Sequence, residues 1–550
     1  MGVEYRRDQT AHVSVLLRTS RDLHGIAPDI PWVGIAAAAA LVRDSRYRRA
    51  DIGALLEQAF DAEAKTWWSI GHALSGEPSA SLAHTPACVA NASDFGQMLA
   101  WVRLVRDWGR EDVSTLVVCD DPWLFRQLQT ISGVDAARPP GLLGRTVMLT
   151  LRGLAARAAA AAKFAAASWF LRDRSKESSG GPFLMVYGHP TSTSDGYDGY
   201  FGSLQMNLPA LGRMLHVDCA VPRARVLAST GRSQSLHGFG SPLFALLRLP
   251  FVRWRPSRHA RSGPYGWLVR RAAAHEGGTA QAAAIRWQIH CQDRWLERRR
   301  PSVVAWPWEN HNWERAFVRS ARRLGIRTVG YQHSVVGRQM LNYAGYSNAD
   351  GAASLPDTIL CSGAATREQL LHWGHDAASM RIGGAWRFQK GAAPSHQPDA
   401  PIFVALPFDG RISAEMVAAV RSCAGPGRAF LIKDHPMTPF MFMDSPGVTR
   451  TQQPLHQQSA LSAVVYAATT VGLEAVLSGL PTIRYRPSER IALDILPGDV
   501  TVTVAESETL AEALDRAQVP VRIDADRIFA PVDKKRWDDV LGSDGLMDSK

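Results

Sequence analysis

Short apolar runs alternate with helical runs between positions 401 and 485, and this alternation constrains the fold more than any other feature of the chain. The expected strands cover 401–407, 429–433, 463–467 and 482–485, and the expected helices cover 412–423 and 471–479. Strands that are separated by single helices are typical of parallel βαβ units. This part of the sequence therefore predicts an α/β fold built on a parallel sheet.

The same construction appears earlier in the chain. A strand is expected at 303–306, the helix after it ends at Gly325, and a second strand follows. Glu309, in WENHN, comes after the first strand, and His333, in QHS, comes after the second. The carboxyl ends of parallel strands meet at one edge of a sheet, where such sheets bind ligands. Both side chains are therefore expected on one ligand-binding rim.

The length of 550 residues is more than one hydrophobic core usually supports, so two domains are expected. Residues 1–175 are expected to be partly helical and to form an extension of, or an insertion into, the first domain. Rossmann-like domains are expected over 176–352 and 353–550. A hinge is expected at 353–363, with TILCS, 358–362, as the first strand of the second domain. Two such sheets that face each other across a cleft suit an enzyme that uses a nucleotide.

The sequence IKDHP, at 432–436, follows one of the predicted strands and carries groups that suit a phosphate. Lys433 and His435 are the expected phosphate contacts. Pro436 fixes the direction in which the chain leaves the strand.

A second polar cluster, ATTVGLE, begins the helix that is expected at 471–479. Thr469 and Thr470 stand at its N-terminus, where backbone N–H groups and the helix dipole favour an anion, and Glu474 is placed to accept ribose hydroxyls. The structural alternative is that Thr470 only caps the helix. We favour the binding interpretation, because the two clusters support each other and the spacing is one residue too long for a capping box.

Several classes of site lack their signature in this sequence. No GxxxxGK[ST] and no GxGxxG follows a strand, so P-loop NTPases and dinucleotide dehydrogenases are not indicated. No HExxH or DxD-type cluster stands where a metal is needed. This favours a metal-independent transfer in which basic residues and helix N-termini stabilise a leaving phosphate.

The pairing of His435-Pro436 with TTVGLEAVLSGLP resembles the nucleotide-sugar half of GT-B glycosyltransferases. The stretch ENHNWERAFVRSARRLGIRTVGYQHS resembles bacterial surface-carbohydrate (capsule and O-antigen) biosynthesis proteins. The resemblance covers roughly 180–520 and implies a GT-B fold, in which 176–352 binds the acceptor and 353–550 binds the donor. It further implies a nucleotide-sugar as co-substrate with no other cofactor, and a glycan or lipid-linked glycan as acceptor. Because several families with an HP motif take CMP-linked sugars, a CMP-sugar such as CMP-Kdo is the favoured donor.

A transferase of this kind also needs a base for the acceptor hydroxyl. The candidates are Asp195 and Asp198, in the glycine-flanked loop SDGYDGY, and Glu309. His333 is a candidate acid, base or diphosphate contact.

Three other functions stay open. The sequence GYQHS resembles the CDP-glycerol polyol-phosphate transferases, although Ser334 stands where these usually have glycine. A nucleotide-sugar epimerase of the same fold and a non-catalytic GT-B scaffold in polysaccharide assembly are the remaining alternatives.

Arginine is concentrated in one part of the chain. Between 251 and 330 there are sixteen Arg and no Lys against five Asp or Glu. The densest part, 252–271, combines six Arg with Trp254, Tyr265 and Trp267, a composition that suits an anionic membrane or glycan. The alternative is a solvated, Arg-rich face. No nucleic-acid-binding motif is present, so we expect no nucleic acid partner.

The longest apolar stretch, 154–170, is too short and too charged to span a bilayer. It predicts either an interfacial helix or an Ala-rich helix that packs on the protein. The polar first residues do not indicate a secretory leader, and six scattered cysteines without a CxxC pair suit a reducing compartment. A cytoplasmic protein, associated with the inner face of the cell membrane, is expected.

Overall fold

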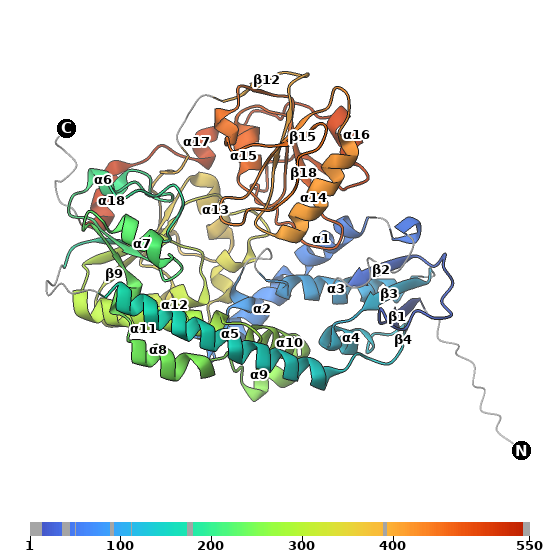
Figure 1. Ribbon diagram of the computed structural model, residues 1–550, viewed down its shortest axis with the longest axis horizontal. Helices are drawn as coiled ribbons and strands as arrows, with labels where there is room; N and C mark the ends of the chain where they lie inside the picture. The colour runs from blue at the N-terminus through green and yellow to red at the C-terminus, as the bar shows by residue number, and fades with distance from the viewer. Residues whose placement is uncertain are drawn as a thin grey trace, which may run out of the picture.

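Two parallel β-sheets form the two lobes of the computed structural model, and a third, smaller parallel sheet lies at its N-terminal end (Figure 1). The structure describes residues 14–35, 45–49, 51–88, 93–111, 113–172, 180–388 and 393–542. The α/β class with two Rossmann-like domains, which the sequence predicts, is confirmed by these sheets.

The central sheet has the strand order β11-β10-β9-β8-β5-β6-β7, and all its neighbouring strands are parallel. Its strands are β5 (Phe183–Val186), β6 (Gly212–Leu215), β7 (Ser233–Ser235), β8 (Val303–Pro307), β9 (Arg327–Gln332), β10 (Thr358–Cys361) and β11 (Met380–Ile382). The helices between them are α6 (Leu204–Asn207), α7 (Val221–Leu227), α8 (Pro242–Arg248), α9 (Arg258–Ser262), α10 (Gly266–Gly277), α11 (Gln281–Arg299), α12 (Asn312–Arg323) and α13 (Ala364–His372). The strand order reverses between β5 and β8, and a doubly wound sheet binds its ligand at such a switch point.

The C-terminal sheet repeats this plan with the order β15-β14-β13-β17-β18-β19. Its strands are β13 (Ile402–Ala405), β14 (Phe430–Lys433), β15 (Val448–Arg450), β17 (Val464–Tyr466), β18 (Thr482–Tyr485) and β19 (Thr503–Ala505). Its helices are α14 (Gly410–Cys423), α15 (Val471–Leu477) and α16 (Leu510–Asp515), and β12 (Ser395–His396) pairs separately with β16 (Ala460–Leu461). The switch point lies between β13 and β17. Each strand and helix that the alternating pattern predicts in this half is present.

The strand at 358–361 is the main departure from the expected division of the chain. β10 pairs in parallel with β9, so it belongs to the central sheet and not to the C-terminal sheet with which the sequence analysis grouped it. The chain also returns to the central lobe through α17 (Ala525–Ile528) and α18 (Lys534–Leu541). Trp537 of α18 is fully buried there and packs edge-to-face on Tyr331 of β9. The pairing of β10 with β9 and the contact of Trp537 with Tyr331 therefore assign β10 and α18 to the central lobe.

The N-terminal region contains a sheet of its own, where the sequence analysis expected a partly helical extension or insertion. The strand order is β2-β3-β1-β4, and the strands are β1 (Val15–Arg18), β2 (Trp32–Ile35), β3 (Thr115–Cys119) and β4 (Val134–Ala136). Its helices are α1 (Ile52–Ala62), α2 (Ala64–Ser75), α3 (Phe95–Trp108), α4 (Pro122–Leu128) and α5 (Leu142–Phe170). The expected boundary at 175 lies outside the described residues. One continuous hydrophobic core joins this region to the central sheet.

A buried ion pair ties the N-terminal region to the C-terminal lobe. Arg484 of β18 donates to both carboxylate oxygens of Glu57 in α1, at 2.7 and 2.9 Å, and both side chains are buried. Arg486 donates to the same carboxylate at 2.7 Å. Burial alone raises the pKa of Glu57, but the hydrogen bonds and charges of the two arginines outweigh it and lower that pKa. Glu57 is therefore held ionised between two parts of the chain that are far apart in sequence.

We predict that Glu57→Ala lowers the free energy of unfolding by about 3–5 kcal/mol, because it leaves Arg484 buried without its partner. Urea unfolding at neutral pH, followed by tryptophan fluorescence, measures this loss. Because the pKa of Glu57 is lower in the folded protein, its contribution is present above the ordinary value of 4.5 and is lost as the pH falls through the folded pKa. The difference between wild type and variant should therefore shrink in acid. Glu508, which is exposed, provides the control, and an equal effect of Glu508→Ala would contradict the assignment.

Candidate functional site

The carboxyl edges of the two large sheets supply the polar side chains of the candidate site. On the central sheet, His189 follows β5, Glu309 follows β8 and His333 follows β9, and these three strands are neighbours. On the C-terminal sheet, His435 follows β14 and Thr469 follows β17. β13 lies between those two strands, so the strands are about 10 Å apart, a distance that suits a nucleotide lying across the end of β13.

Arg387 brings the two edges together. It lies in the segment between β11 and the C-terminal sheet, and its charge acts on His189 and His333 of one lobe and on His435 and Glu474 of the other. The charge of His435 also acts on His189, so groups of the two lobes influence each other directly. Arg387 is exposed, and among the described residues no carboxylate forms an ion pair with it. The polar edges of the two large sheets therefore act on one common set of side chains.

The histidines around Arg387 are neutral at pH 7. Burial, followed by the charge of Arg387, lowers the pKa of His189 and His435 to about 4. The same two causes lower the pKa of His333 to about 3. Burial raises the pKa of Glu474 to about 7, and Arg387 opposes this rise, so this carboxyl is partly protonated. An anion that enters here meets the guanidinium of Arg387 together with neutral imidazoles.

Hydrogen bonds to the backbone fix the tautomer of two of these histidines. The N–H of Met437 donates to Nδ1 of His435 at 3.3 Å, and the N–H of Thr191 donates to Nδ1 of His189 at 3.2 Å. In a neutral imidazole whose Nδ1 accepts, the proton is on Nε2. Each of these two histidines therefore has an Nε2–H donor left for a ligand. Phe408, after β13, packs edge-to-face on His435 with ring centroids 5.6 Å apart.

Glu309 lies on the same rim and has the properties of an acid–base group. Burial raises its pKa to about 7, although 32% of its side chain is exposed. Its negative charge acts on Tyr200, whose ring contacts His333 edge-to-face at 4.8 Å and which also feels Arg387. Tyr200 thus lies between Glu309 and the cluster around Arg387.

The loop that carries Glu309 is held rigidly. The backbone N–H of Glu309 donates to the carboxylate of Glu314 at 2.9 Å, and its carbonyl accepts from Nδ2 of Asn342 at 2.7 Å. Nε2 of His311 lies 3.4 Å from the Glu309 carboxylate. Asn310 has φ of 57°, a left-handed conformation that asparagine tolerates better than most residues, and its side chain donates to the Asn342 carbonyl. The polar residues of WENHN therefore position the carboxylate.

The structure places the remaining predicted residues less centrally. Asp195 is exposed, and its carboxylate accepts from Thr193 and no contact joins it to the cluster among the described residues. Lys433 is half-buried at the end of β14, and burial followed by the charge of Arg450 lowers its pKa. Pro436 is exposed beside His435. Asp198, the other loop carboxylate, is fully buried and accepts from the N–H groups of its own turn, which gives it a structural role.

The two threonines lie at the switch point of the C-terminal sheet. Thr469 and Thr470 are both half-buried, and the side chain of Thr470 makes no capping hydrogen bond to α15. The side chain of Thr470 therefore does not cap the helix, contrary to the structural alternative. Ala468, directly before them, has φ of 46°, a conformation that costs free energy for alanine and turns the chain sharply at this edge.

Three residues of this cluster are absent from the sequence-based candidates: His189, Tyr200 and Arg387. His189 had a signal, since GHP after β5 repeats the His-Pro pair that follows β14. Tyr200 lies in the same loop as Asp195. Arg387 had no signal, because GAWRF matches no motif.

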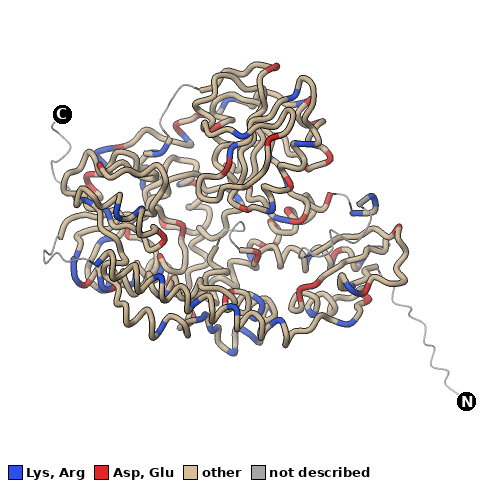
Figure 2. The backbone as a smooth tube through the Cα atoms, in the orientation of Figure 1, with Lys and Arg blue, Asp and Glu red and all other residues tan. Residues whose placement is uncertain are grey.

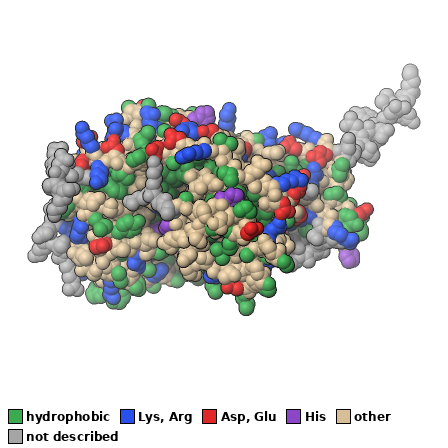
Figure 3. All heavy atoms as spheres, turned by 90° about the horizontal axis from the view of Figure 1, so that it is seen from above, with side chains coloured by type: hydrophobic (Ala, Val, Ile, Leu, Met, Phe, Trp, Pro, Cys, Tyr) green, Lys and Arg blue, Asp and Glu red, His purple; other side chains and the backbone are tan. Residues whose placement is uncertain are grey.

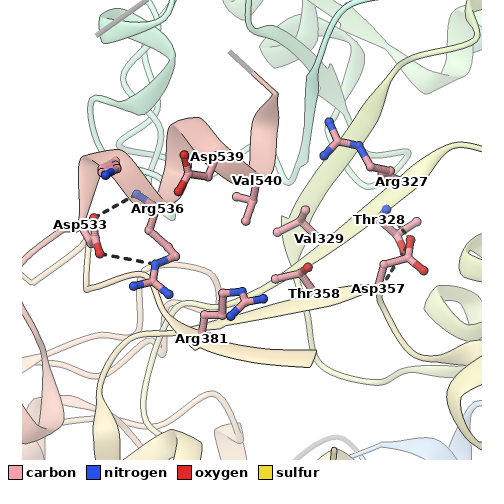
Figure 4. Close-up of a pocket in the computed structure, with 11 residues that line it drawn as sticks. Arg327, Thr328, Val329, Asp357, Thr358, Arg381, Asp533, Arg536, Asp539 and Val540 are labelled. Carbon is pink, nitrogen blue, oxygen red and sulfur yellow. Dashed lines mark hydrogen bonds and ion pairs between the residues drawn. The ribbon is translucent and has the colours of Figure 1, made fainter. Parts of the chain in front are cut away.

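A cavity of about 540 Å³ lies at the opposite edge of the central sheet, where β9 and β10 begin and α18 lies alongside (Figure 4). Its charged lining consists of Arg327, Arg381, Lys535, Arg536, Asp357, Asp533 and Asp539. Asp533 is engaged with Arg536 and Asp357 with Thr328. Both signs of charge are present, and the cavity is far from the strand ends that carry the cluster, so we assign it no part in the chemistry.

Comparisons with known proteins add the following. No protein-family model matches this sequence, and no curated protein matches it. Among solved structures, the apo form of the lipopolysaccharide outer core galactosyltransferase WaaB is 12% identical, with 66% of this chain and 99% of that chain covered and a TM-score of 0.35. The glycosyltransferase SnogD from Streptomyces nogalater is 14% identical, with 67% and 94% covered and a TM-score of 0.36.

The Methanocaldococcus jannaschii UDP-GlcNAc 2-epimerase, solved with UDP-GlcNAc and UDP, is 11% identical, with 61% of this chain and 92% of that chain covered and a TM-score of 0.34. We draw nothing further from these three likenesses, because every TM-score lies below 0.5.

We predict that Arg387→Met raises the pKa of His435 and His189, because it removes the positive charge that opposes their protonation. Titration of the histidine ring protons by NMR measures both pKa values. Arg516→Met, which changes an exposed arginine of the C-terminal lobe, should leave them unchanged. If Arg387→Met left both pKa values where they are, Arg387 would not lie between the lobes as described.

Proposed function

We propose that this chain is a glycosyltransferase that moves a sugar from a nucleotide-activated donor to a carbohydrate acceptor. The observation that carries the proposal is Arg387, which has no carboxylate in an ion pair with it in the part of the chain that the structure describes and which acts on histidines at both sheet edges. A nucleotide-sugar has a negative diphosphate or phosphate ester between an apolar base and a sugar. A guanidinium with neighbouring N–H donors matches such a group.

The residues of the C-terminal lobe bind the donor in this proposal. Arg387 and the Nε2–H of His435 contact the phosphate, with Thr469 and Thr470 supplying hydroxyls and Lys433 assisting. Glu474 binds the ribose hydroxyls, as the resemblance to GT-B enzymes implies. Phosphate stabilisation by these groups makes the transfer independent of a metal ion.

Glu309 is the proposed base. The acceptor hydroxyl attacks the anomeric carbon, its proton passes to the Glu309 carboxylate, and the bond from that carbon to the phosphate oxygen breaks. The bonding pair leaves with the nucleotide, whose new negative charge is stabilised by Arg387. In this proposal the sugar lies beside His333 and Tyr200, whose rings contact each other.

The finer features of the proposal come from the sequence resemblance alone. They are a CMP-sugar such as CMP-Kdo as donor, a surface-polysaccharide or lipid-linked glycan as acceptor, and capsule or O-antigen assembly as the process. Cytoplasmic residence with peripheral membrane contact through 252–271 belongs to the same proposal.

One alternative is favoured by a specific contact. His333, in the GYQHS sequence, lies within the field of Arg387 and beside Tyr200, where it is also placed to act on a phosphorus atom. A polyol-phosphate transferase that uses CDP-glycerol would make a new phosphodiester, whereas a glycosyltransferase product contains none. Phosphorus analysis of the product distinguishes the two.

We predict that CMP, CDP, UDP or GDP binds with an affinity that His435→Ala and Arg387→Ala each reduce roughly tenfold to a hundredfold, the loss expected for a hydrogen bond to a charged group. Calorimetric titration of the four nucleotides measures this. His456→Ala, a matched change in the same lobe, serves as control. Unchanged nucleotide affinity in both site variants would remove the donor site.

We predict that Glu309→Gln lowers kcat by about 10²–10⁴-fold while nucleotide affinity is retained, because the amide cannot accept the proton. A base must be ionised, so kcat of the wild type should rise as the pH increases through about 7, the pKa of Glu309. The variant should lose this limb of the pH profile. The assay uses the donor that binds in the titration, and retention of the limb in Glu309→Gln would assign the base elsewhere.

A further inference from the structure

The helix α5 exposes an apolar stripe that no other described element covers. Leu143, Val147, Leu151 and Leu154 recur at helical spacing and are all exposed, Leu143 to 78%. The helix has 29 residues and is therefore about 43 Å long. Exposed leucines in series on one face of a helix are costly in water, and they mark a surface that meets something apolar.

The neighbouring helix α8 extends this stripe. α5 and α8 pack side by side, and the short turn at Leu249–Phe251 also packs on α5. Leu243, Leu246 and Leu247 of α8 are exposed, and Phe251 is 69% exposed. Both helices lie along the lower side of the molecule, away from the C-terminal lobe (Figure 1).

Positive charge surrounds these apolar side chains. Residues 142–170 and 242–275 contain eleven Lys and Arg and no Asp or Glu. Figure 2 accordingly shows basic but no acidic residues along α5. The exposed members are Arg145, Arg152, Lys163, Arg248, Arg253, Arg255, Arg258, Arg261 and Arg270. On the opposite face of the molecule, basic and acidic side chains are interspersed (Figure 3).

Two of the three aromatic residues of the Arg-rich stretch do not reach the surface, contrary to the sequence-based expectation. Trp254 and Trp267 are buried in the core, and Tyr265 alone of the three is exposed. The apolar part of the surface is instead supplied by α5 and α8. The sequence analysis expected an apolar helix at 154–170, whereas the exposed stripe of α5 lies over 143–154, and it made no prediction for α8. Leucines and arginines on adjacent helices, without an acid between them, form one amphipathic surface.

We propose that α5, α8 and Phe251 form a docking surface for a bilayer that contains anionic phospholipid. The leucines and Phe251 enter the boundary between headgroups and acyl chains, and the surrounding arginines pair with lipid phosphates. No helix among the described residues is long and apolar enough to cross a bilayer. The contact is thus peripheral. The inference deepens the membrane contact of the proposed function, because it moves the apolar part of that contact from 252–271 to α5, α8 and Phe251. It rests on these surface residues and does not depend on catalysis.

Charge decides against a second copy of this chain as the occupant. A symmetric dimer places the same surface of both subunits face to face. Here that would bring two sets of arginines together without an acidic residue to pair with, which is unfavourable. An anionic bilayer supplies the missing charge and the apolar layer together.

The test is flotation of the full chain with phosphatidylcholine vesicles, with and without phosphatidylglycerol. We expect binding to the anionic vesicles only, and release of the protein at high salt. The double variant Leu243→Glu/Leu247→Glu should bind at least tenfold more weakly. Each substitution removes a leucine that the bilayer would bury and adds a negative charge that anionic lipid repels. Met441→Glu/Met443→Glu, at exposed positions of the C-terminal lobe, should bind as the wild type does.

A second variant, Arg253→Glu/Arg255→Glu/Arg258→Glu, leaves the leucines in place and tests the charge separately. It should lose binding to anionic vesicles, while its melting temperature and its nucleotide affinity stay unchanged. Equal binding of the wild type to neutral and anionic vesicles would overturn the proposal, as would undiminished binding of the leucine variant. A dimer in solution that Leu243→Glu/Leu247→Glu dissociates, without vesicle binding, would overturn it in favour of a second copy.

Discussion

The buried carboxylate of Glu57, held by Arg484 and Arg486, is the interaction on which the relation between the lobes depends. The central and C-terminal lobes are also joined by the segment around Arg387, by the returning helices α17 and α18, and by a hydrophobic core that contains residues of both lobes. Glu57 adds a directional tie to this packing, because α1 packs on the core of the N-terminal region and its carboxylate reaches into β18. The N-terminal region therefore acts as a brace between the two lobes.

Bracing matters because the candidate site is divided between those lobes. The proposed donor contacts follow strands of the C-terminal sheet, and Glu309 and His333 follow strands of the central sheet. A shift of one lobe by a few ångströms would separate the proposed base from the proposed phosphate contacts. Arg387 lies in the segment that joins the lobes, so its position changes with both. The electrostatics of the site thus depend on packing far from the site itself.

The parts of the fold that the sequence predicts are those in which local pattern and tertiary structure agree. The strands at 401–407 and 429–433 are apolar and short, a helix separates them, and they pair as parallel neighbours in the structure. His435 and Thr469 are recognisable for the same reason, since each directly follows such a strand. For Thr358–Cys361 the local pattern predicts the strand but not the sheet to which it belongs. Its sequence predicts a strand correctly, but nothing local in it specifies β9 as the partner.

Arg387 and the N-terminal sheet could not be predicted from the sequence, because both depend on contacts between distant parts of the chain. An arginine becomes a candidate through what surrounds it, and the four groups around Arg387 come from positions 189 to 474. The N-terminal strands are three to five residues long. Within the described ranges, no helix separates β1 from β2, three α-helices lie between β2 and β3, and one lies between β3 and β4, so no repeating βαβ period marks these strands. Such elements are defined by the core that they share with the rest of the molecule.

The placement of α5 connects the proposed docking surface with the division of the site. α5 joins the N-terminal sheet to the central sheet, and the exposed stripe belongs to those two parts alone. A bilayer at this surface contacts the lobe that carries Glu309 and leaves the C-terminal lobe turned to solvent. An acceptor with a lipid anchor would then approach from the side of the proposed base, and a water-soluble donor from the other side. The two substrates would reach the cluster around Arg387 from different phases without competing for one entrance.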